Sequence, residues 1–354
     1  MSSARTSHGR VDGVIVRAPN HLGDLVMALP ALTGRDARCA TGDAGAAADV
    51  VVVRGLTPLL EMAGGHGEVL PLDRGMRGFW AAVGELRRRR YARGVLLTPS
   101  FGSALLFAAG GVAHRRGTPT DARGALLHDG VPVESLRAMH RASAYVLLAT
   151  GHAPDEPPAP ALDVPDDARD RFSALAGPDA GRPTIGLFPG SNASSRRWDA
   201  DRYASLARRL AREGVRVLVF GGTQEARLTA QVAGEAALDL GGRTDLPMLA
   251  AGLAACRLLV SNDSGPMHLA AAVGTPTVTL QGPADPVVTR PLGERHVMLR
   301  HPELPCVPCV KNVCPRSGRG YVLPDATREC LRLISVDDAL ETVRAHPAMP
   351  LTSP

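Results

Sequence analysis

The segment over residues 260–286 constrains the fold of this chain more than any other part of its sequence. A short apolar run at 258–260 ends in a polar cluster at 262–265. A helix rich in small residues is expected from 266 to about 273, and a second strand-like run follows at 277–280. This order of strand, tight polar turn, helix and strand predicts a βαβ unit.

The polar turn of this segment carries its chemistry. It contains Asn262, Asp263, Ser264 and Gly265, and His268 follows one helical turn later. A helix start directs free backbone N–H groups and the positive end of the helix dipole at such a turn, so a phosphate is the expected ligand. The alternative is an ordinary βαβ unit in which Ser264 or Asp263 only caps the helix.

The length and composition of the chain fit two α/β domains. It has 354 residues, of which 45% are hydrophobic and 21% charged, as in soluble globular proteins. No apolar run approaches the roughly 20 residues that a membrane span needs. The first ten residues, MSSARTSHGR, lack the apolar core of a signal peptide, so we expect residues 1–12 to be a disordered tail on a cytoplasmic protein.

The charge balance favours an anionic partner other than nucleic acid. The net charge is +5 and the isoelectric point is about 9.1, but only 3% of the residues are aromatic. Too few aromatic residues alternate with the basic ones to form a nucleic-acid surface. The basic run at 87–90 is expected to be the solvated end of a helix.

Four of the six cysteines form a cluster near the C-terminus. The cluster is Cys306, Cys309, Cys314 and Cys330, with the spacing C-x2-C-x4-C-x15-C. This spacing leaves open zinc or an iron–sulfur centre, local disulfides, and unligated or redox-sensitive thiols. A cytoplasmic setting disfavours disulfides. Cys39 and Cys256 are expected to be isolated, reduced core residues.

The rest of the chain repeats the alternation of strand and helix. Residues 14–16, 49–53 and 94–97 are expected strands, with Asp24 opening a helix that Pro30 ends or kinks. This alternation predicts a parallel sheet whose strand ends line a binding crevice.

A Pro- and Asp-rich stretch at 152–167 divides the chain, which predicts domains at 13–160 and 161–334 and a C-terminal helix at 335–346. Two doubly wound halves joined by one linker suggest a cleft between domains, the usual place for a transfer between two substrates.

The second half restarts with a strand at 184–187 and a turn at 189–192, and a basic pair, Arg196 and Arg197, then precedes Trp198 and a helix. A further strand at 215–220 ends in a Gly-Gly turn, with Glu225 just beyond. Neither half has G-x-G-x-x-G after its first strand or a P-loop, which disfavours a nicotinamide dehydrogenase or a nucleoside triphosphatase.

These segments together resemble glycosyltransferase family 9, the heptosyltransferases that build the inner core of lipopolysaccharide. RAPNHLGDLVMALPAL resembles the N-terminal signature of that family, and FPGSNASSRRW resembles its second-domain motif. GGTQE followed by NDSGPMHLAAAVGTPTVTLQGPADP is similar to its nucleotide-sugar segment. The likeness covers about residues 14–343 and is closer to the enzymes that add the second heptose than to those that add the first.

The resemblance implies a GT-B architecture, in which two Rossmann-like doubly wound domains face a central cleft. It implies that the N-terminal domain binds the acceptor and the C-terminal domain binds ADP-heptose. By this likeness Asp24 is the general base, Arg197 binds the donor phosphates, Glu225 contacts the sugar nucleotide, and Asp263, Ser264, Gly265 and His268 form the donor pocket. Family members often carry Lys where this chain has Arg197, and both side chains can hold a diphosphate.

The same residues fit an inverting transfer on chemical grounds. The acceptor hydroxyl must lose its proton as it attacks the sugar carbon, for which one carboxylate is enough. The departing diphosphate needs positive charge, which Arg197 and the helix start near Ser264 can supply. No Asp-x-Asp pair stands in the donor segment, so we expect no metal or other cofactor. The alternative for Asp24 is a carboxylate that only caps its helix.

The acceptor side is expected to contain cations, because lipopolysaccharide core carries acidic groups. Arg115, Arg116 and Arg123 lie in a segment at 107–127 that resembles the acceptor region of the family. We expect them to bind the lipopolysaccharide core and to allow reversible contact with the anionic cytoplasmic face of the membrane. The alternative is a solvated loop.

Two further functions remain open from the sequence. The same fold and reaction could serve another glycan or a secondary metabolite, because acceptor specificity lies in the N-terminal half. A non-catalytic module that binds nucleotide sugars is the other alternative, against which the intact Asp24 argues.

Overall fold

The computed structural model describes residues 13–33, 47–315 and 328–349. The chain divides into two units, residues 1–158 (unit 1) and 159–354 (unit 2). This division lies two residues before the predicted one after residue 160. The predicted tail at 1–12 and Cys39 lie outside the described residues.

Unit 1 is built on a parallel sheet of six strands in the order β3-β2-β1-β4-β5-β6. The strands are β1 (Val14–Arg17), β2 (Asp49–Val53), β3 (Val69–Leu72), β4 (Arg93–Leu96), β5 (His114–Gly117) and β6 (Asp129–Gly130). Every neighbouring pair is parallel, and β1 at the centre pairs Val16 with Val50 and Val95. The three strands predicted in this half are confirmed to within one residue at each end.

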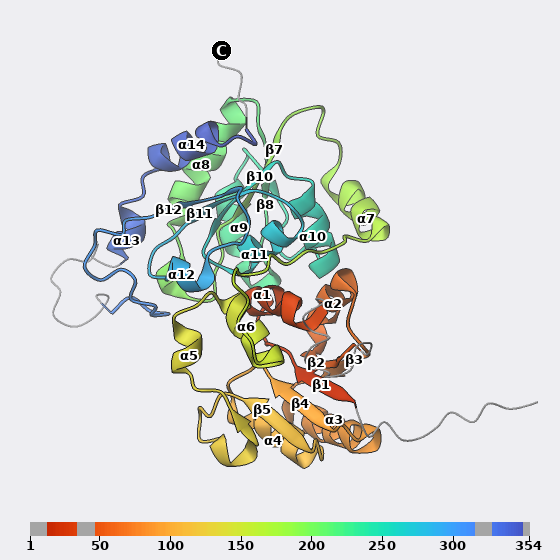
Figure 1. Ribbon diagram of the computed structural model, residues 1–354. Helices are drawn as coiled ribbons and strands as arrows, with labels where there is room; N and C mark the ends of the chain where they lie inside the picture. The colour runs from red at the N-terminus through yellow and green to blue at the C-terminus, as the bar shows by residue number, and fades with distance from the viewer. Residues whose placement is uncertain (1–12, 34–46, 316–327, 350–354) are drawn as a thin grey trace, which may run out of the picture. The chain divides into compact units, whose positions relative to one another are not determined.

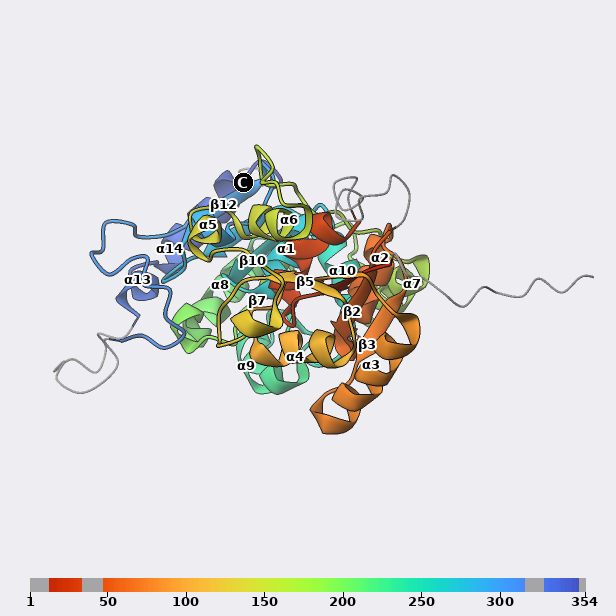
Figure 2. The same cartoon turned by 60° about the horizontal axis from the view of Figure 1, so that its bottom comes forward.

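Helices cover both faces of this sheet. They are α1 (Leu22–Thr33), α2 (Thr57–Ala63), α3 (Gly75–Arg89), α4 (Phe101–Ala109), α5 (Glu134–Arg137) and α6 (Arg141–Thr150). Figure 2 shows α3 and α4 on one side of the strands and α1 and α6 on the other, and the members of each pair pack against each other. The prediction that Pro30 ends or kinks α1 is wrong as to the end, since the helix continues to Thr33. Pro30 removes one hydrogen bond near the end of a helix whose apolar residues are buried.

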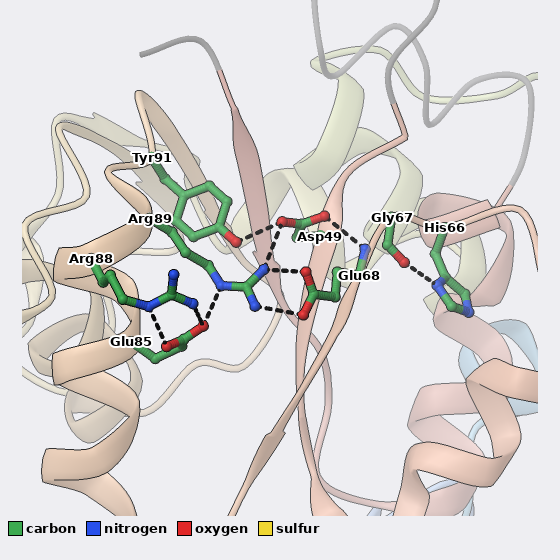
Figure 3. A network of polar contacts seen from close by, with 8 residues as sticks. All are labelled: Asp49, His66, Gly67, Glu68, Glu85, Arg88, Arg89 and Tyr91. Carbon is green, nitrogen blue, oxygen red and sulfur yellow. Dashed lines mark hydrogen bonds and ion pairs between the residues drawn. The ribbon is translucent and has the colours of Figure 1, made fainter. Parts of the chain in front are cut away.

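A buried polar network fastens β2, β3 and α3 together where β2 begins (Figure 3). The Asp49 carboxylate is 3% exposed and accepts hydrogen bonds from the Glu68 N–H at 2.7 Å and the Tyr91 hydroxyl at 2.6 Å. Arg89 lies 3.7 Å from Asp49 and bridges Glu68 and Glu85 at 2.5 Å each. Burial, followed by the hydrogen bond to Asp49, raises the pKa of Tyr91 well above its usual value, so its hydroxyl stays a donor.

This network partly revises the prediction for the basic run at 87–90. Arg88 is exposed and pairs with Glu85 at 2.6 Å, as expected for a solvated helix end. Arg89 instead has a side chain that is only 18% exposed and holds three carboxylates. Hydrogen bonds from Arg88 and Arg89 lower the pKa of Glu85 to about 2. The end of α3 is therefore a structural junction as well as a solvated surface.

Unit 2 has the same architecture. Its six parallel strands lie in the order β12-β11-β10-β7-β8-β9. They are β7 (Thr184–Phe188), β8 (Arg216–Val219), β9 (Leu238–Asp239), β10 (Leu258–Asn262), β11 (Thr277–Leu280) and β12 (His296–Leu299). The helices are α7 (Asp166–Ala176), α8 (Ala200–Arg212), α9 (Ala226–Ala233), α10 (Leu246–Ala254), α11 (Gly265–Ala272), α12 (Pro286–Thr289), α13 (Glu329–Arg332) and α14 (Val336–Ala345).

The apolar core of unit 2 lies between the sheet and α8. Leu206 and Leu210 of α8, Val260 of β10 and Leu340 of α14 are fully buried in one cluster. In Figure 1, α8 and α14 lie side by side on one side of the strands, and α10 lies on the other, where it packs against α7 and α11. The predicted C-terminal helix is α14, and Ser335 and Asp338 cap each other's backbone N–H as expected. The fold class, α/β with two Rossmann-like units, is confirmed.

We predict that Asp49→Asn lowers the free energy of unfolding by about 1–3 kcal/mol. The substitution replaces one carboxylate oxygen with an amide nitrogen, which cannot accept a hydrogen bond. One of the two buried donors that Asp49 satisfies is then left unpaired. Urea denaturation measures this loss. The matched control is Asp73→Asn, whose carboxylate pairs with Arg54 between exposed side chains and which should change stability far less. Equal effects of the two substitutions would show that the network does not stabilise unit 1.

Candidate active site

The start of α11 forms the predicted polar turn at the carboxyl end of β10. Strand β10 ends at Asn262 and the helix begins at Gly265, one residue before the predicted start. Ser264 is the N-cap residue, yet its side chain makes no capping hydrogen bond, and its hydroxyl donates to the Asn262 carbonyl at 3.4 Å. The helix start therefore offers backbone N–H groups to a ligand, as an anion site requires.

The side chain of Asn262 joins this turn to two other segments. It is fully buried, and its amide nitrogen donates to the Pro189 carbonyl at 2.7 Å. Its amide oxygen accepts from the Trp198 N–H at 3.0 Å and from the Tyr203 hydroxyl at 3.2 Å. One carboxamide thus fixes the loop after β7, the start of α8 and the end of β10. Asn262 was predicted only as part of a polar turn, and its role in joining the three segments was not predicted.

Asp263 lies directly after Asn262 and pairs with a cation. It is 2% exposed, and its Oδ2 lies 3.1 Å from the Arg196 guanidinium. The two groups are close but not aligned as a hydrogen bond, and this buried oxygen has no other hydrogen-bond partner among the described residues. Burial raises the pKa of Asp263, and the charge of Arg196 opposes that shift. His268, on the first turns of α11, is also buried.

The two arginines of the basic pair before Trp198 therefore make different contacts. Arg196 makes the ion pair with Asp263, whereas the exposed Arg197 donates from Nε to the Ser191 carbonyl at 2.7 Å. Within the described residues no protein group bonds the two terminal nitrogens of Arg197. Of this pair, only Arg197 was predicted to have a role in the site, by its likeness to the family motif, and the ion pair of Arg196 with Asp263 was not predicted.

Glu225 lies in the short helix at 223–225 that follows β8, and the turn after β7 packs against it. Its Oε2 accepts from the Gly222 N–H at 2.9 Å. A Cβ atom at Gly190 would lie 1.7 Å from Oε1 of the same carboxylate, so a larger residue there would displace the Glu225 side chain. The carboxylate of Glu225 is thereby placed at the same edge of the unit 2 sheet as Asp263.

Asp24 lies at the corresponding edge of the sheet in unit 1. Helix α1 begins at Leu22, so the partly exposed Asp24 belongs to the first turn and is not the capping residue. A carboxylate there is stabilised by the helix dipole. Tyr145 of α6 lies near Asp24, and burial followed by the Asp24 charge raises the pKa of Tyr145 well above its usual value. No local sequence pattern indicates Tyr145, because only the packing of α1 on α6 brings the two residues together.

The predicted acceptor cations are mostly engaged with the protein. Arg123 is 0% exposed, and its guanidinium donates to the carbonyls of Thr98 at 2.5 Å and Thr118 at 2.7 Å. This burial argues against the predicted contact of Arg123 with an acceptor and identifies it as a structural residue of unit 1. Arg115 and Arg116 are partly buried and bonded to carbonyls and to Asp129, and their acceptor role stays a prediction.

The clustered cysteines Cys306, Cys309, Cys314 and Cys330 line one small cavity of about 20 Å³ in unit 2. All four are free thiols, which disagrees with the disulfide alternative. Burial raises the pKa of Cys330 to about 11. Among the described residues, no three His, Cys, Asp or Glu side chains are arranged to hold a metal ion. Nor does any helix in the described part combine the length and apolarity needed to cross a lipid bilayer.

Comparison with known proteins shows to which family the chain is similar. The family model described as glycosyltransferase family 9 (heptosyltransferase) matches residues 79–318. The chain is 30% identical to lipopolysaccharide heptosyltransferase 2 of Escherichia coli K12 over 312 residues, which is 81% of this chain and 87% of that protein. It is also 35% identical to lipopolysaccharide heptosyltransferase 1 of Pseudomonas aeruginosa over 167 residues, or 44% of this chain and 46% of that protein.

A solved structure extends the likeness to the fold. The structure of E. coli ADP-heptose lps heptosyltransferase II matches with a TM-score of 0.77 and 26% sequence identity, covering 94% of this chain and 98% of that one. Both units are therefore included in the match. The family resemblance predicted from the sequence motifs is confirmed: this chain belongs to glycosyltransferase family 9, the heptosyltransferase family.

Proposed function

We propose that this protein is an inverting glycosyltransferase that moves heptose from ADP-heptose to the inner core of lipopolysaccharide, as the enzymes that add the second heptose do. The observation that carries the proposal is the likeness to heptosyltransferase 2 across 87% of that protein, together with a solved heptosyltransferase II of the same fold. The positions predicted for donor binding lie at one edge of the unit 2 sheet, which supports a single nucleotide-sugar site.

Asp24 is proposed as the base of this reaction. Its carboxylate would accept the proton of the attacking acceptor hydroxyl as the new glycosidic bond forms. Tyr145 supports this role, because its phenol stays protonated beside the carboxylate and would donate a hydrogen bond to it. The bond from the sugar to the diphosphate breaks on the opposite face, and ADP leaves as an anion that needs no proton.

The donor is proposed to bind in unit 2. Arg197 would donate two charge-assisted hydrogen bonds to phosphate oxygens, and the backbone at Ser264 and Gly265 would add the helix-start donors. Asp263, Glu225 and His268 complete the proposed donor site. Asp263 would contribute its charge from behind the start of α11, where Arg196 balances it.

We also propose that the reaction takes place in the cytoplasm, with peripheral contact at the anionic face of the inner membrane. A nucleotide sugar is doubly charged at its diphosphate and does not cross a lipid bilayer unaided, whereas the acceptor is anchored in one. An enzyme that joins them must meet both at the membrane surface.

Transfer itself should need no metal ion, because Arg197 and the start of α11 supply the positive charge at the diphosphate. Purified protein with ADP-heptose and a heptosylated inner-core acceptor should release ADP and add one heptose, equally well with and without EDTA. Mass spectrometry of the product and ADP release measure this. Complete loss of transfer that Mg²⁺ restores would contradict the metal-free mechanism, and failure to use this donor with any core acceptor would contradict the proposed function.

Replacing the proposed base should stop chemistry without weakening donor binding. Asp24→Asn is expected to lower turnover on the order of 10²–10⁴-fold, since the amide cannot take up a proton. ADP affinity, measured by calorimetry, should stay the same because the donor binds in unit 2. Glu61→Gln, an exposed carboxylate on α2, is the matched control and should keep full turnover. Near-normal turnover of folded Asp24→Asn would remove this residue from the mechanism.

Arg197 provides the corresponding test of the donor site. Arg197→Ala should weaken ADP binding by roughly 1.5–3 kcal/mol, the range for hydrogen bonds to a charged group. Arg212→Ala, at the exposed end of α8, removes the same charge away from the site and should leave ADP affinity unchanged. Calorimetry that shows equal ADP affinity for both variants would exclude Arg197 as a phosphate ligand.

A further inference from the structure

Unit 1 contains a cavity of about 430 Å³ that none of the roles above uses. It opens at the carboxyl edge of the sheet, where β1 ends and the loops before α1, α3 and α4 come together. Its polar lining is Arg17, Asn20, His21, Asp73, Arg74, Ser100 and Ser103. Every lining residue belongs to unit 1, so the cavity is a property of that unit alone.

Arg17 is a buried cation without a counter-ion. Arg17 is the last residue of β1 and is 2% exposed. One terminal nitrogen donates to the carbonyls of Ala18 at 2.5 Å and Val51 at 3.2 Å, and the other donates to the Asn20 amide oxygen. Nε has no partner, and no carboxylate of the described residues forms an ion pair with this guanidinium. Burial lowers the pKa of Arg17 to about 10, which leaves it charged at neutral pH.

A buried guanidinium is costly unless a charge or enough acceptors surround it. The one carboxylate in the cavity lining, Asp73, is already held by Arg54 through two hydrogen bonds of 2.5 and 2.7 Å. Arg74 adds a second, exposed cation at the rim. The cavity therefore has an excess of positive charge and lacks an anion.

The remaining lining residues suit a ligand with a hydroxylated ring, such as a sugar, better than they suit a small inorganic ion. Ser100 and Ser103, whose hydroxyls are 2.8 Å apart, place hydroxyl groups on one wall. On the other, Phe79 lines the cavity and meets Trp80 edge to face at 5.3 Å between ring centroids.

Aromatic residues are only 3% of this chain, and one of them, Phe79, lines this cavity. An aromatic face beside hydroxyl and guanidinium donors suits the apolar face and polar edge of a saccharide.

We propose that this cavity binds the carboxylate of an acidic saccharide, with Arg17 as the central cation that selects acidic over neutral sugars. This deepens the proposed function, on which it rests for the identification of that saccharide as part of the acceptor. The loop that lines the cavity through Asn20 and His21 leads directly into α1, which carries Asp24 in its first turn. An acidic sugar held by Arg17 would therefore be placed beside the proposed base.

The test compares a core oligosaccharide acceptor that bears carboxylates and no phosphate with the same compound after reduction of its carboxylates to alcohols. The unsubstituted protein should show a KM for the reduced acceptor roughly 10–100-fold higher than for the acidic one. Arg17→Met should raise the KM of the acidic acceptor to that of the reduced one while ADP affinity stays unchanged. If Arg17→Met still prefers the acidic acceptor as strongly as the unsubstituted protein does, the proposal is wrong.

The matched control is Arg123→Met. Arg123 is equally buried and bonded to carbonyl oxygens, but it does not line the cavity. Its replacement should preserve the preference for the acidic acceptor even if stability falls. A loss of preference in both variants would show that the effect comes from destabilised structure and would overturn the role of Arg17.

A second variant covers the case in which Arg17→Met fails to fold. Gly102 lines the cavity in the first turn of α4 and has open space where a Cβ would lie, so Gly102→Asp adds a negative charge without displacing a neighbour. This variant should also lose the preference for the acidic acceptor, whereas Gly102→Asn should keep most of it. Unchanged preference in Gly102→Asp would contradict an anion site in this cavity.

Calorimetry with the acidic oligosaccharide in the absence of donor separates failure of this site from failure of the proposed function. If the protein transfers no heptose to either acceptor, the proposed function fails, and binding alone then tests the cavity. Binding that requires both the carboxylates and Arg17 supports the site. Equal binding of the acidic and reduced compounds overturns it.

Discussion

The fully buried carboxamide of Asn262 is the interaction on which the candidate donor site depends. Its nitrogen and oxygen hold the loop after β7, the start of α8 and the end of β10 with three hydrogen bonds of 2.7–3.2 Å. Those segments carry Arg196, Arg197 and Asp263. A parallel sheet brings strand ends to one edge but does not by itself order the loops beyond them. In unit 2 a single side chain provides that order.

Unit 1 uses the same edge of its sheet in a different way. Here the first loop lies between a buried cation at its beginning, Arg17, and a carboxylate at its end, Asp24. Tyr145 reaches Asp24 from α6, and Asn20 accepts a hydrogen bond from Arg17 within the loop. The opposite end of the strands, where β2 begins, is held together by the Asp49 network. Stability and proposed function are thus placed at opposite ends of the same strands.

The sequence predicted the fold well because the strands of parallel sheets are short, buried and continuous in their apolar character. β2 and β10 contain their predicted apolar runs, although β10 continues two residues beyond its run to Asn262, and the turn at 262–265 lies at a helix start as expected. Local capping at Ser335 was equally predictable, because both partners lie within four residues. The end of α1 was not predicted correctly, because the burial of its apolar face outweighs the unfavourable helix propensity of Pro30.

The site was predicted less completely than the fold, because a sequence does not show whether a charged side chain is buried or exposed. Arg123 appeared to be a surface cation beside other arginines, yet carbonyl oxygens from distant loops surround it. No role was predicted for Arg17, which lies at the end of a strand. Tyr145 and Asn262 act through tertiary contacts, which leave no local sequence pattern. Only residues inside family motifs, such as Asp24 and Asp263, could be assigned a role before the structure was known.

A single displacement with one carboxylate as base has a stereochemical consequence that can be read from the product. Attack by the acceptor oxygen on the face opposite the departing ADP inverts the configuration at the anomeric carbon of heptose. The one-bond carbon–hydrogen coupling constant of that carbon, measured by NMR on the purified product and on the ADP-linked donor, reports the configuration of each. We predict opposite anomeric configurations in donor and product. The same configuration in both would contradict the mechanism proposed for Asp24.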